Sequence, residues 1–511
     1  MKSAEILNLS LEDLKDDFDE LEVIVFYTLE KLCNFYYLIE SLKKYSRLET
    51  LNTALENTRY FEKKFLNLST KISKIKAYLK KKKPTLEVVN EIQETKEKYF
   101  EEIRTQIHTI ASIITSLDWQ SPSFSHSIYT MAGKYTGKII GTINDYKRDG
   151  RLDNQILEKW YLKQYIDAKF KFNIHVYATN SGMAAFSTIL NFLIMEKKAE
   201  NNVLIGKNIY HENKKLITKC FSDKLFMVNE LETDKIIELI KQKKPSLIFF
   251  DSLCNTKNIP VPQLSKIIDF LTYRYPHNIY LIIDNTCLST TFQPFKMVQG
   301  KNRKLRLIVF ESLIKYLQFG LDRVNAGIIT AYGKDTEKIM DYREHLGTNI
   351  NDIAVYTIPQ ISRKIYENRL KRLSRNAYLL SSLLQTYIAN NKTLIRQIIY
   401  PMLENHPAYP WAIKMPFGGS FLNLDFQKPN IKIYKKFIDL TVKKAAKRKV
   451  NISGGTSFGF NSSRIYLTAL RIGNTEPFVR ISVGTETYLQ VIKLKEIFLE
   501  VINDLSRFKL F

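Results

Sequence analysis

Hydrophobic positions recur at helical spacing through the first 115 residues. Apolar residues fall every three or four positions in LEVIVFYTLEKLCNFYYLIESL (21–42), a second such segment runs from about 48 to 82, and a third begins after Pro84. No glycine occurs before Gly133. The pattern predicts an all-helical N-terminal module over residues 1–115. Its mixed charges suit a helical bundle, a coiled coil that forms dimers, or a shield over a catalytic domain, and no motif assigns it a function.

After residue 115 the pattern changes. Residues 116–150 contain Ser, Pro and Gly, as in a linker or wrapping arm. Short apolar runs then alternate with helical patterns up to residue 335. These runs lack the polar alternation of half-exposed strands, so they predict a mostly parallel sheet covered by helices on both faces. A long helical zone and a smaller α+β domain are expected over 336–511. The apolar runs are HVYAT, NVLIG, LFMV, PSLIFF, IYLIID, LRLIVF and AGIITA.

Composition narrows the class of protein. With 511 residues, 45% of them hydrophobic and 25% charged, the chain can bury a large core and divide into several domains. The net charge of +25 and the pI near 9.5 would also suit a nucleic-acid-binding protein. However, the basic residues are spread along the chain, and the one dense run, Lys80–Lys83, is typical of a solvated helix end. The sequence therefore favours an ordinary globular protein over a nucleic-acid binder.

The chain also lacks the usual signals for membranes and secretion. It has no run of eighteen uncharged apolar residues, and it begins with the acidic and polar segment MKSAEILNLSLEDLKDDFDE. The four cysteines are far apart and form no metal-binding or redox pair. We expect a cytoplasmic protein without a metal site.

Two residues 31 positions apart indicate the chemistry. Asp284 ends the apolar run NIYLIID, and Lys315 follows the apolar run LRLIVF. A lysine amine can hold the aldehyde of pyridoxal phosphate as a Schiff base, and a carboxylate against the pyridine nitrogen keeps that ring electron-withdrawing. Each residue alone has a plainer explanation, because a strand-end Asp often caps a helix and a lysine after an apolar run often reaches solvent.

Four segments, read in order, resemble a known family. They are TNSGMAAFSTIL (179–190), IIDNTCLSTTFQPF (282–295), FESLIKYLQFGLD (310–322) and FVRISVGTE (478–486). Together they resemble the Cys/Met-metabolism, or transsulfuration, family of fold-type-I pyridoxal phosphate enzymes, which includes cystathionine γ-synthase, cystathionine lyases and homocysteine synthases. The resemblance implies an α/β fold: a large domain with a mostly parallel sheet and a smaller C-terminal α+β domain.

The resemblance also implies cofactor-binding roles. The backbone amides of Gly182 and Met183, at the start of a helix, would bind the phosphate together with Ser312. Tyr210 would stack on the cofactor ring and take part in proton transfer, although a plain core tyrosine is an alternative. Asn255 would lie near the cofactor's phenolic oxygen.

Further residues concern the substrate and the partner subunit. Tyr146 and Arg148 look like the family's Tyr-x-Arg segment, which reaches the phosphate of a neighbouring subunit, so the resemblance implies a homodimer or tetramer with shared active sites; the alternative is a solvated basic loop. Arg480 would bind the α-carboxylate of the substrate, and its alternative is a structural salt bridge with Glu486. Ser453 could line the substrate side.

The implied activity is γ-replacement or elimination on a homoserine ester or a cystathionine-like amino acid. The glutamate that contacts the distal end of the substrate in γ-lyases is absent, and Thr456 or Ser457 stands there. That departure favours a lyase or synthase of a specialised pathway as the second hypothesis. A third is a binding or assembly protein that carries an inactive enzyme domain.

Overall fold

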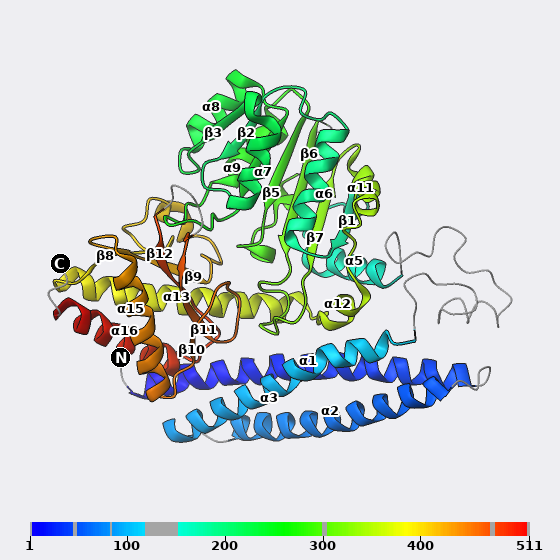
Figure 1. Ribbon diagram of the computed structural model, residues 1–511, viewed down its shortest axis with the longest axis vertical. Coiled ribbons are helices and arrows are strands. Elements are labelled where there is room, and N and C mark those ends of the chain that lie inside the picture. The colour runs from blue at the N-terminus through cyan, green and yellow to red at the C-terminus, as the bar shows by residue number, and fades with distance from the viewer. Residues whose placement is uncertain are drawn as a thin grey trace.

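The structure is a computed structural model that describes residues 3–43, 49–81, 84–117, 152–298, 304–470 and 476–507. Figure 1 shows a helical bundle along the bottom, a large α/β part at the top, and a smaller part with its own sheet at the left. One long helix, drawn in yellow, runs between the bundle and the rest of the molecule. The N-terminal helices therefore pack on the remainder of the chain.

The bundle confirms the predicted helical extension. Its first helix begins well before residue 21, because Leu11 and Leu14 in the polar N-terminal segment are buried against the bundle. Pro84 separates the second and third helices, and Thr85 caps the third by accepting a hydrogen bond from the Val88 amide. No helix in the described part of the chain is long and apolar enough to span a membrane. The helices are α1 (Ser3–Lys43), α2 (Glu49–Lys81) and α3 (Leu86–Ile114).

The large part is built on a seven-stranded sheet of order β1-β7-β6-β5-β4-β2-β3. Strand β7 is antiparallel to both of its neighbours, and the other strand pairs are parallel. Every apolar run that the sequence predicted as a strand is a strand of this sheet. The strands are β1 (Ile174–Thr179), β2 (Val203–Gly206), β3 (Leu225–Val228), β4 (Leu247–Asp251), β5 (Ile279–Asp284), β6 (Leu305–Ser312) and β7 (Gly327–Tyr332).

The two faces of this sheet pack on different helices. On β5, Tyr280 and Ile282 pack in a cluster with α6 and α7, whereas Leu281 and Ile283 pack in the larger cluster on the opposite face. Successive side chains of a strand point to opposite faces, so both faces must be apolar. The helices of this part are α5 (Leu152–Tyr165), α6 (Gly182–Met195), α7 (His211–Phe221), α8 (Thr233–Lys243), α9 (Leu264–Tyr273), α10 (Pro294–Met297), α11 (Ile339–His345) and α12 (Asp352–Thr357).

The C-terminal part is the expected smaller α+β unit. Its five-stranded sheet has the order β10-β11-β12-β9-β8, with one parallel pair, β10 and β11. Helices α13 and α16 pack together, as do α15 and α16. The predicted fold class is thereby confirmed. The elements are α13 (Arg363–Asn390), β8 (Ile395–Ile399), α14 (Tyr409–Ala412), β9 (Phe421–Phe426), α15 (Ile431–Lys447), β10 (Ile452–Gly454), β11 (Ser463–Thr468), β12 (Phe478–Ser482) and α16 (Tyr488–Arg507).

Helix α1 contacts α13 through ion pairs whose aspartates are buried. Asp17 pairs with Arg372 at 2.8 Å and Asp13 with Arg375 at 2.7 Å. Asp13 also accepts a hydrogen bond from the Tyr488 amide at 2.7 Å, at the first residue of α16. The apolar residues of the bundle belong to the same buried cluster as one face of the large sheet. Whether 1–115, 116–335 and 336–511 act as separate domains therefore stays a prediction.

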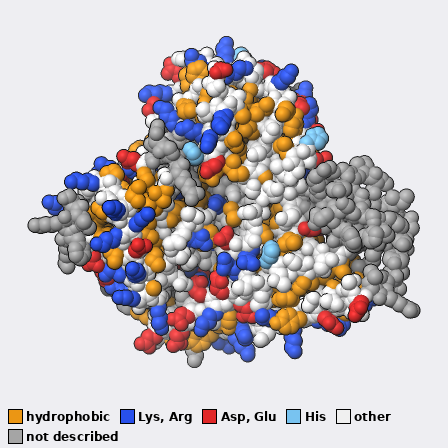
Figure 2. Space-filling model, viewed as in Figure 1, with side chains coloured by type: hydrophobic (Ala, Val, Ile, Leu, Met, Phe, Trp, Pro, Cys, Tyr) orange, Lys and Arg blue, Asp and Glu red, His pale blue; other side chains and the backbone are white. Residues whose placement is uncertain are grey.

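The surface charge agrees with a dispersed basic excess. On the face shown in Figure 2, Lys and Arg side chains are interspersed with Asp and Glu side chains over all three parts. Within the described residues, no group of three or more His, Cys, Asp or Glu side chains is placed to hold a metal ion.

Candidate active site

Three polar side chains gather where the parallel strands of the large sheet end. Asp251, Asp284 and Ser312 are the last residues of β4, β5 and β6. Each shares the strand face of the apolar residues that pack on α6 and α7, such as Phe249 and Phe310. Ligands of open α/β sheets bind beyond the carboxyl ends of the strands. The sheet therefore directs all three side chains toward one crevice.

Asp284 is a partly buried carboxyl group whose hydrogen-bond donors are uncharged. It accepts from the Thr286 amide at 3.0 Å and from the Asn213 side chain of α7 at 3.4 Å. Burial raises the pKa of Asp284, and the positive charge of Lys315 opposes that shift. A cation bound against Asp284 would stabilise its ionised form.

Asp251 lies beside Asp284 and positions Tyr210. The two aspartates are register partners on adjacent strands, and Asp251 accepts a hydrogen bond from the Tyr210 amide at 2.9 Å. Burial, followed by the charge of Asp284, raises the pKa of Asp251 well above its ordinary range. Burial thus favours the neutral acid at both aspartates, and more strongly at Asp251. Burial also raises the pKa of the Tyr210 hydroxyl.

The start of α6 approaches the end of β6 very closely. Ser181 caps α6 by accepting from the Ala184 amide at 3.0 Å, which leaves Gly182 and Met183 in the first turn. A Cβ atom on Gly182 would lie 2.6 Å from Cβ of Ser312. Only glycine permits this approach, which places free helix N-terminal amides beside a serine. The three predicted phosphate-binding residues are therefore adjacent.

Lys315 lies in the turn after β6, and its amine is partly buried. Its Nζ donates a hydrogen bond to Oγ of Ser457 at 2.6 Å and lies 5.3 Å from the centre of the Phe458 ring. Burial lowers the pKa of the Lys315 amine. Gly459 packs against the Lys315 backbone, where a Cβ atom would lie 2.2 Å from the carbonyl oxygen. A lowered pKa increases the unprotonated fraction of the amine, which is the form that acts as a nucleophile and a base.

Arg480 on β12 is a buried cation with uncharged partners. It donates to Asn423 at 2.8 Å, to the Asn255 side chain, and to the Thr256 carbonyl at 3.2 Å. The alternative partner, Glu486, accepts instead from the Ser463 amide. Among the described residues, none of the hydrogen-bond partners of Arg480 is a carboxylate. Its charge is therefore available for an anionic ligand.

Two aromatic rings join the surroundings of Arg480 to those of Lys315. The Arg480 guanidinium lies 4.3 Å from the centre of the Phe421 ring, and that ring centre lies 5.1 Å from the centre of the Phe458 ring. Lys315 in turn lies over Phe458. The lysine and the arginine therefore face one apolar wall.

The remaining predicted site residues are placed less centrally. Ser453 is exposed on β10, and it is Ser457 that contacts Lys315. Tyr146 and Arg148 lie outside the described residues. Sequence reasoning assigned no role to Asn213 or Thr286. A signal for each was present, because Asn213 follows Tyr210 by one helical turn and Thr286 follows Asp284 by two residues, the spacing of a local Asp turn.

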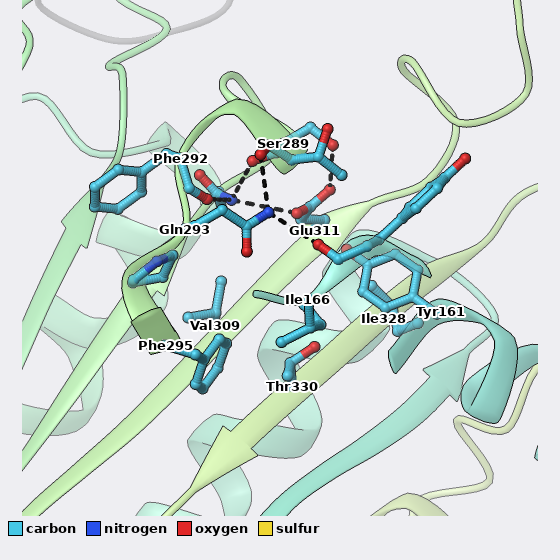
Figure 3. A pocket seen from close by; sticks show the side chains of 14 residues that line it. Tyr161, Ile166, Ser289, Phe292, Gln293, Phe295, Val309, Glu311, Ile328 and Thr330 are labelled. Atoms are coloured by element: carbon cyan, nitrogen blue, oxygen red, sulfur yellow. Dashed lines mark hydrogen bonds between the residues drawn. The ribbon is translucent and has the colours of Figure 1, made fainter. Parts of the chain in front are cut away.

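Glu311, next to Ser312 on β6, points to the opposite face of the sheet. Figure 3 shows it in a small pocket with Ser289 and Tyr161. It accepts hydrogen bonds from Ser289 at 2.9 Å and from Asn285 at 3.3 Å. Burial raises the pKa of Glu311 to about 7. A second buried polar network therefore lies on the face of the sheet opposite to the crevice.

Comparison with known sequences decides the family. The sequence model of the Cys/Met metabolism PLP-dependent enzymes matches residues 119–495. The chain belongs to this family. Its cofactor is pyridoxal phosphate, as predicted.

Solved structures of low sequence identity share the fold. Cystathionine γ-synthase from Xanthomonas oryzae is 16% identical with a TM-score of 0.55, over 75% of this chain and 91% of that one. Cystathionine γ-lyase from yeast is 20% identical with a TM-score of 0.55, over 72% and 90%. A putative O-acetylhomoserine (thiol)-lyase from Campylobacter jejuni, which holds a pyridoxyl-lysine phosphate, is 18% identical with a TM-score of 0.54, over 75% and 93%.

A curated relative is the bifunctional enzyme flvA of Aspergillus flavus. It is 24% identical over 314 residues, which are 60% of this chain and 37% of the fungal protein. The chain thus matches little more than a third of the length of that relative.

The residues in the crevice fit pyridoxal phosphate. Asp284 is a partly buried carboxyl group with neutral donors, as a cationic pyridinium partner requires, and Lys315 is a partly buried amine of lowered pKa. The close approach of Gly182 to Ser312 provides donors for an anion at a helix N-terminus.

Proposed function

We propose that the chain is a transsulfuration-type enzyme that performs γ-replacement or γ-elimination on an amino acid such as a homoserine ester or cystathionine. One observation carries the proposal: the partly buried carboxyl group of Asp284 and the buried guanidinium of Arg480 flank the amine of Lys315, whose pKa burial lowers, and both have uncharged hydrogen-bond partners. A cofactor with a cationic ring and a substrate with a carboxylate would complete this arrangement.

Each residue has a defined task in this proposal. Arg480 binds and orients the α-carboxylate of the amino acid through its guanidinium group. Lys315 holds the cofactor and, once released by substrate, moves protons between substrate carbons. Pyridoxal phosphate supplies an electron sink for negative charge on the α-carbon when it is bound. Phe421 and Phe458 exclude water from the space between Lys315 and Arg480.

Further residues hold the cofactor in the proposal. Asp284 binds the pyridine nitrogen. Tyr210, whose backbone amide donates a hydrogen bond to Asp251, stacks on the ring and assists proton transfer. Gly182, Met183 and Ser312 bind the phosphate. Asn255 reaches the cofactor side of the crevice while it accepts from Arg480.

A second candidate is a lyase or synthase of a specialised pathway. It is favoured by the 455–461 loop, where Ser457 contacts Lys315 and no glutamate is present to bind the distal end of a γ-lyase substrate. Ser453 on the neighbouring strand would line the substrate side. This second candidate has the same cofactor chemistry as the first, but its substrate has a different side chain.

A third candidate, an assembly protein with an inactive enzyme domain, is disfavoured. Lys315, Asp284 and Arg480 are all present, and the first two are partly buried in surroundings that suit the cofactor. We further propose a cytoplasmic homodimer or tetramer, in which Tyr146 and Arg148 reach the phosphate of the neighbouring subunit.

The test is a substrate panel with the purified full-length chain. O-acetyl-, O-succinyl- and O-phosphohomoserine are each supplied with cysteine or sulfide, and cystathionine is supplied alone, with products identified by mass spectrometry. We expect turnover of at least one. Lys315→Ala should reduce that turnover by about 1000-fold or more, because it removes both the cofactor attachment and the base.

The control for Lys315→Ala is Lys371→Ala, an exposed lysine on α13. It should retain full turnover. Absence of the cofactor's visible absorbance from the purified protein, or persistence of the lysine-bound absorbance band in Lys315→Ala, would contradict the proposed site. Turnover of other amino acids alone would support the second candidate.

A further inference from the structure

Glu20 on α1 belongs to the N-terminal bundle and forms a buried ion pair with the enzyme domain. Its Oε1 lies 2.6 Å from Nη1 of Arg369 on α13. The Glu20 side chain is 13% exposed and the Arg369 side chain 1%. Burial shields this pair from solvent and salt, so it can fix geometry in a way that an exposed pair does not.

The other terminal nitrogen of the Arg369 guanidinium contacts the 455–461 loop. Its Nη2 donates to the Gly459 carbonyl at 3.2 Å and to the Asn461 side chain at 2.5 Å. The same guanidinium lies 5.8 Å from the centre of the Phe319 ring, in the turn after Lys315. Arg369 therefore connects the bundle to both segments that enclose Lys315.

These two segments set the position of the Lys315 amine. Ser457 accepts the hydrogen bond from Nζ, and Gly459 packs on the Lys315 carbonyl. Ser457 has a φ of 76°, and Phe319 and Asp322 have φ values of 54° and 51°. Left-handed conformations are unfavourable for these residue types and persist where surrounding contacts hold them.

Helix α3 holds the second segment independently. Nε of Arg104 donates to the Leu321 carbonyl at 3.0 Å, between two residues with positive φ, Gly320 and Asp322. Arg464 of β11 lies 3.7 Å from the Asp322 carboxylate on the same turn. The bundle thus contacts the enclosure of Lys315 at two places, through α1 and through α3.

The geometry points to Glu20 as a positioning residue for Lys315, acting through Arg369 on the 455–461 loop, with Arg104 as a weaker second contact. The bundle is then a working part of the active site, which sets the burial and the orientation of the Lys315 amine. This inference rests on the proposed role of Lys315. It gives the N-terminal module a function that no sequence motif indicated.

The experiment compares Glu20→Ala with Glu20→Gln in the full-length chain. Backbone hydrogen exchange is measured over residues 316–322 and 455–461. The pH dependence of Lys315 acetylation is measured with the cofactor removed, and kcat and KM are measured with the cofactor bound. In Glu20→Ala we expect exchange in both segments to accelerate about 10-fold. The pKa of Lys315 should rise toward its ordinary value, because looser loops admit water to the amine.

The two Glu20 variants should affect turnover in the same order as they affect exchange and acetylation. We expect kcat of Glu20→Ala to fall about 10-fold with little change in KM, because misplacement of a reacting group affects the chemical step. Glu20→Gln should recover most of the loss, since its amide oxygen can still accept from Arg369. Two controls are Glu12→Ala, an exposed acid on the same helix, and Asp17→Ala, which breaks the pair with Arg372 in the same interface.

Equal exchange and equal Lys315 acetylation in Glu20→Ala and Glu12→Ala would overturn the inference. So would an equal effect in Asp17→Ala, because the bundle would then act through docking alone. If Glu20→Ala does not fold, Arg104→Gln decides: we expect about a 3-fold change in the same direction, and none would overturn the inference. Exchange and acetylation need no substrate, so a failed substrate panel does not affect this outcome.

Discussion

The interface between α1 and α13 and the crevice at the strand ends both bury charged side chains, but they compensate these charges differently. At the interface, Arg372 is matched by the carboxylate of Asp17, with side chains 6% and 8% exposed. In the crevice, Arg480 is equally buried but bonds to two asparagines and a carbonyl oxygen. Asp284 bonds to an amide and an asparagine.

The difference separates charges that hold the fold from charges that serve a ligand. A buried ion requires compensation, and a protein that keeps one with dipoles alone retains a strong attraction for an ion of opposite sign. At the interface, that attraction is satisfied by an opposite charge of the same chain. In the crevice, that attraction remains available for the cofactor and the amino acid. The charge of the protein partners therefore distinguishes structural residues from ligand-binding residues.

The largest loss of stability should follow from breaking the ion pair between Asp17 and Arg372 at the interface of α1 and α13. Arg372→Met leaves the buried Asp17 carboxylate without its bidentate partner and should lower the free energy of unfolding by about 3 to 5 kcal/mol. Urea denaturation followed by circular dichroism measures this loss. The exposed neighbour Lys371→Met should change stability by less than about 0.5 kcal/mol. A loss of similar size in Lys371→Met would undo the distinction.

The next effect concerns Glu311, which is buried among neutral donors beneath the site. Its pKa is raised from 4.5 to about 7, so the folded state favours the protonated acid. Stability from this group is complete below pH 4.5, declines as pH rises toward 7, and is gone above it. The whole change is roughly 3 kcal/mol.

The variant Glu311→Gln isolates this contribution. It has no proton to lose, so the free energy of unfolding should depend less on pH between 5 and 8 than that of the unaltered chain. Urea titrations at several pH values provide the comparison. Parallel pH profiles for the two proteins would show that Glu311 is ionised throughout.

The smallest effect on stability, with a clear effect on binding, should come from Arg480. Arg480→Met should raise KM for the amino acid about 100-fold, equivalent to about 2.7 kcal/mol, because the carboxylate loses its cation. Stability should change little, since no carboxylate is left unpaired. Steady-state kinetics and urea denaturation test the two parts. Arg396→Met, which removes an exposed arginine paired with the buried Asp425, is the control and should leave KM unchanged. Instability of Arg480→Met equal to that of Arg372→Met would place Arg480 among the structural charges.

Much of the fold could be predicted because its signals are local. The buried strands lack polar alternation, and the helices repeat every three or four residues, so each was evident from its own segment. The start of α1 was less evident, because the burial of Leu11 and Leu14 depends on distant segments of the chain. The central pair of the site could also be proposed from the sequence, since Asp284 ends one recognisable strand and Lys315 follows another.

The contacts around that pair could not be predicted in the same way. Ser457 is 142 residues from Lys315, and the turn that carries it departs from the family pattern, so only packing shows which of its serines meets the amine. Glu20 is 349 residues from Arg369. A single acidic residue on a long charged helix resembles its neighbours in sequence.

The sequence by itself determined the elements, the family resemblance, the cofactor and the two residues at the centre of the chemistry, because each depends on residue type and short-range spacing. The tertiary structure decided which charges are matched. It paired Asp17 with Arg372, left Arg480 and Asp284 with neutral partners, and brought Glu20 to Arg369, which contacts the loop over Lys315. Charge compensation depends on distance and burial, and these exist only once remote segments of the chain have packed together.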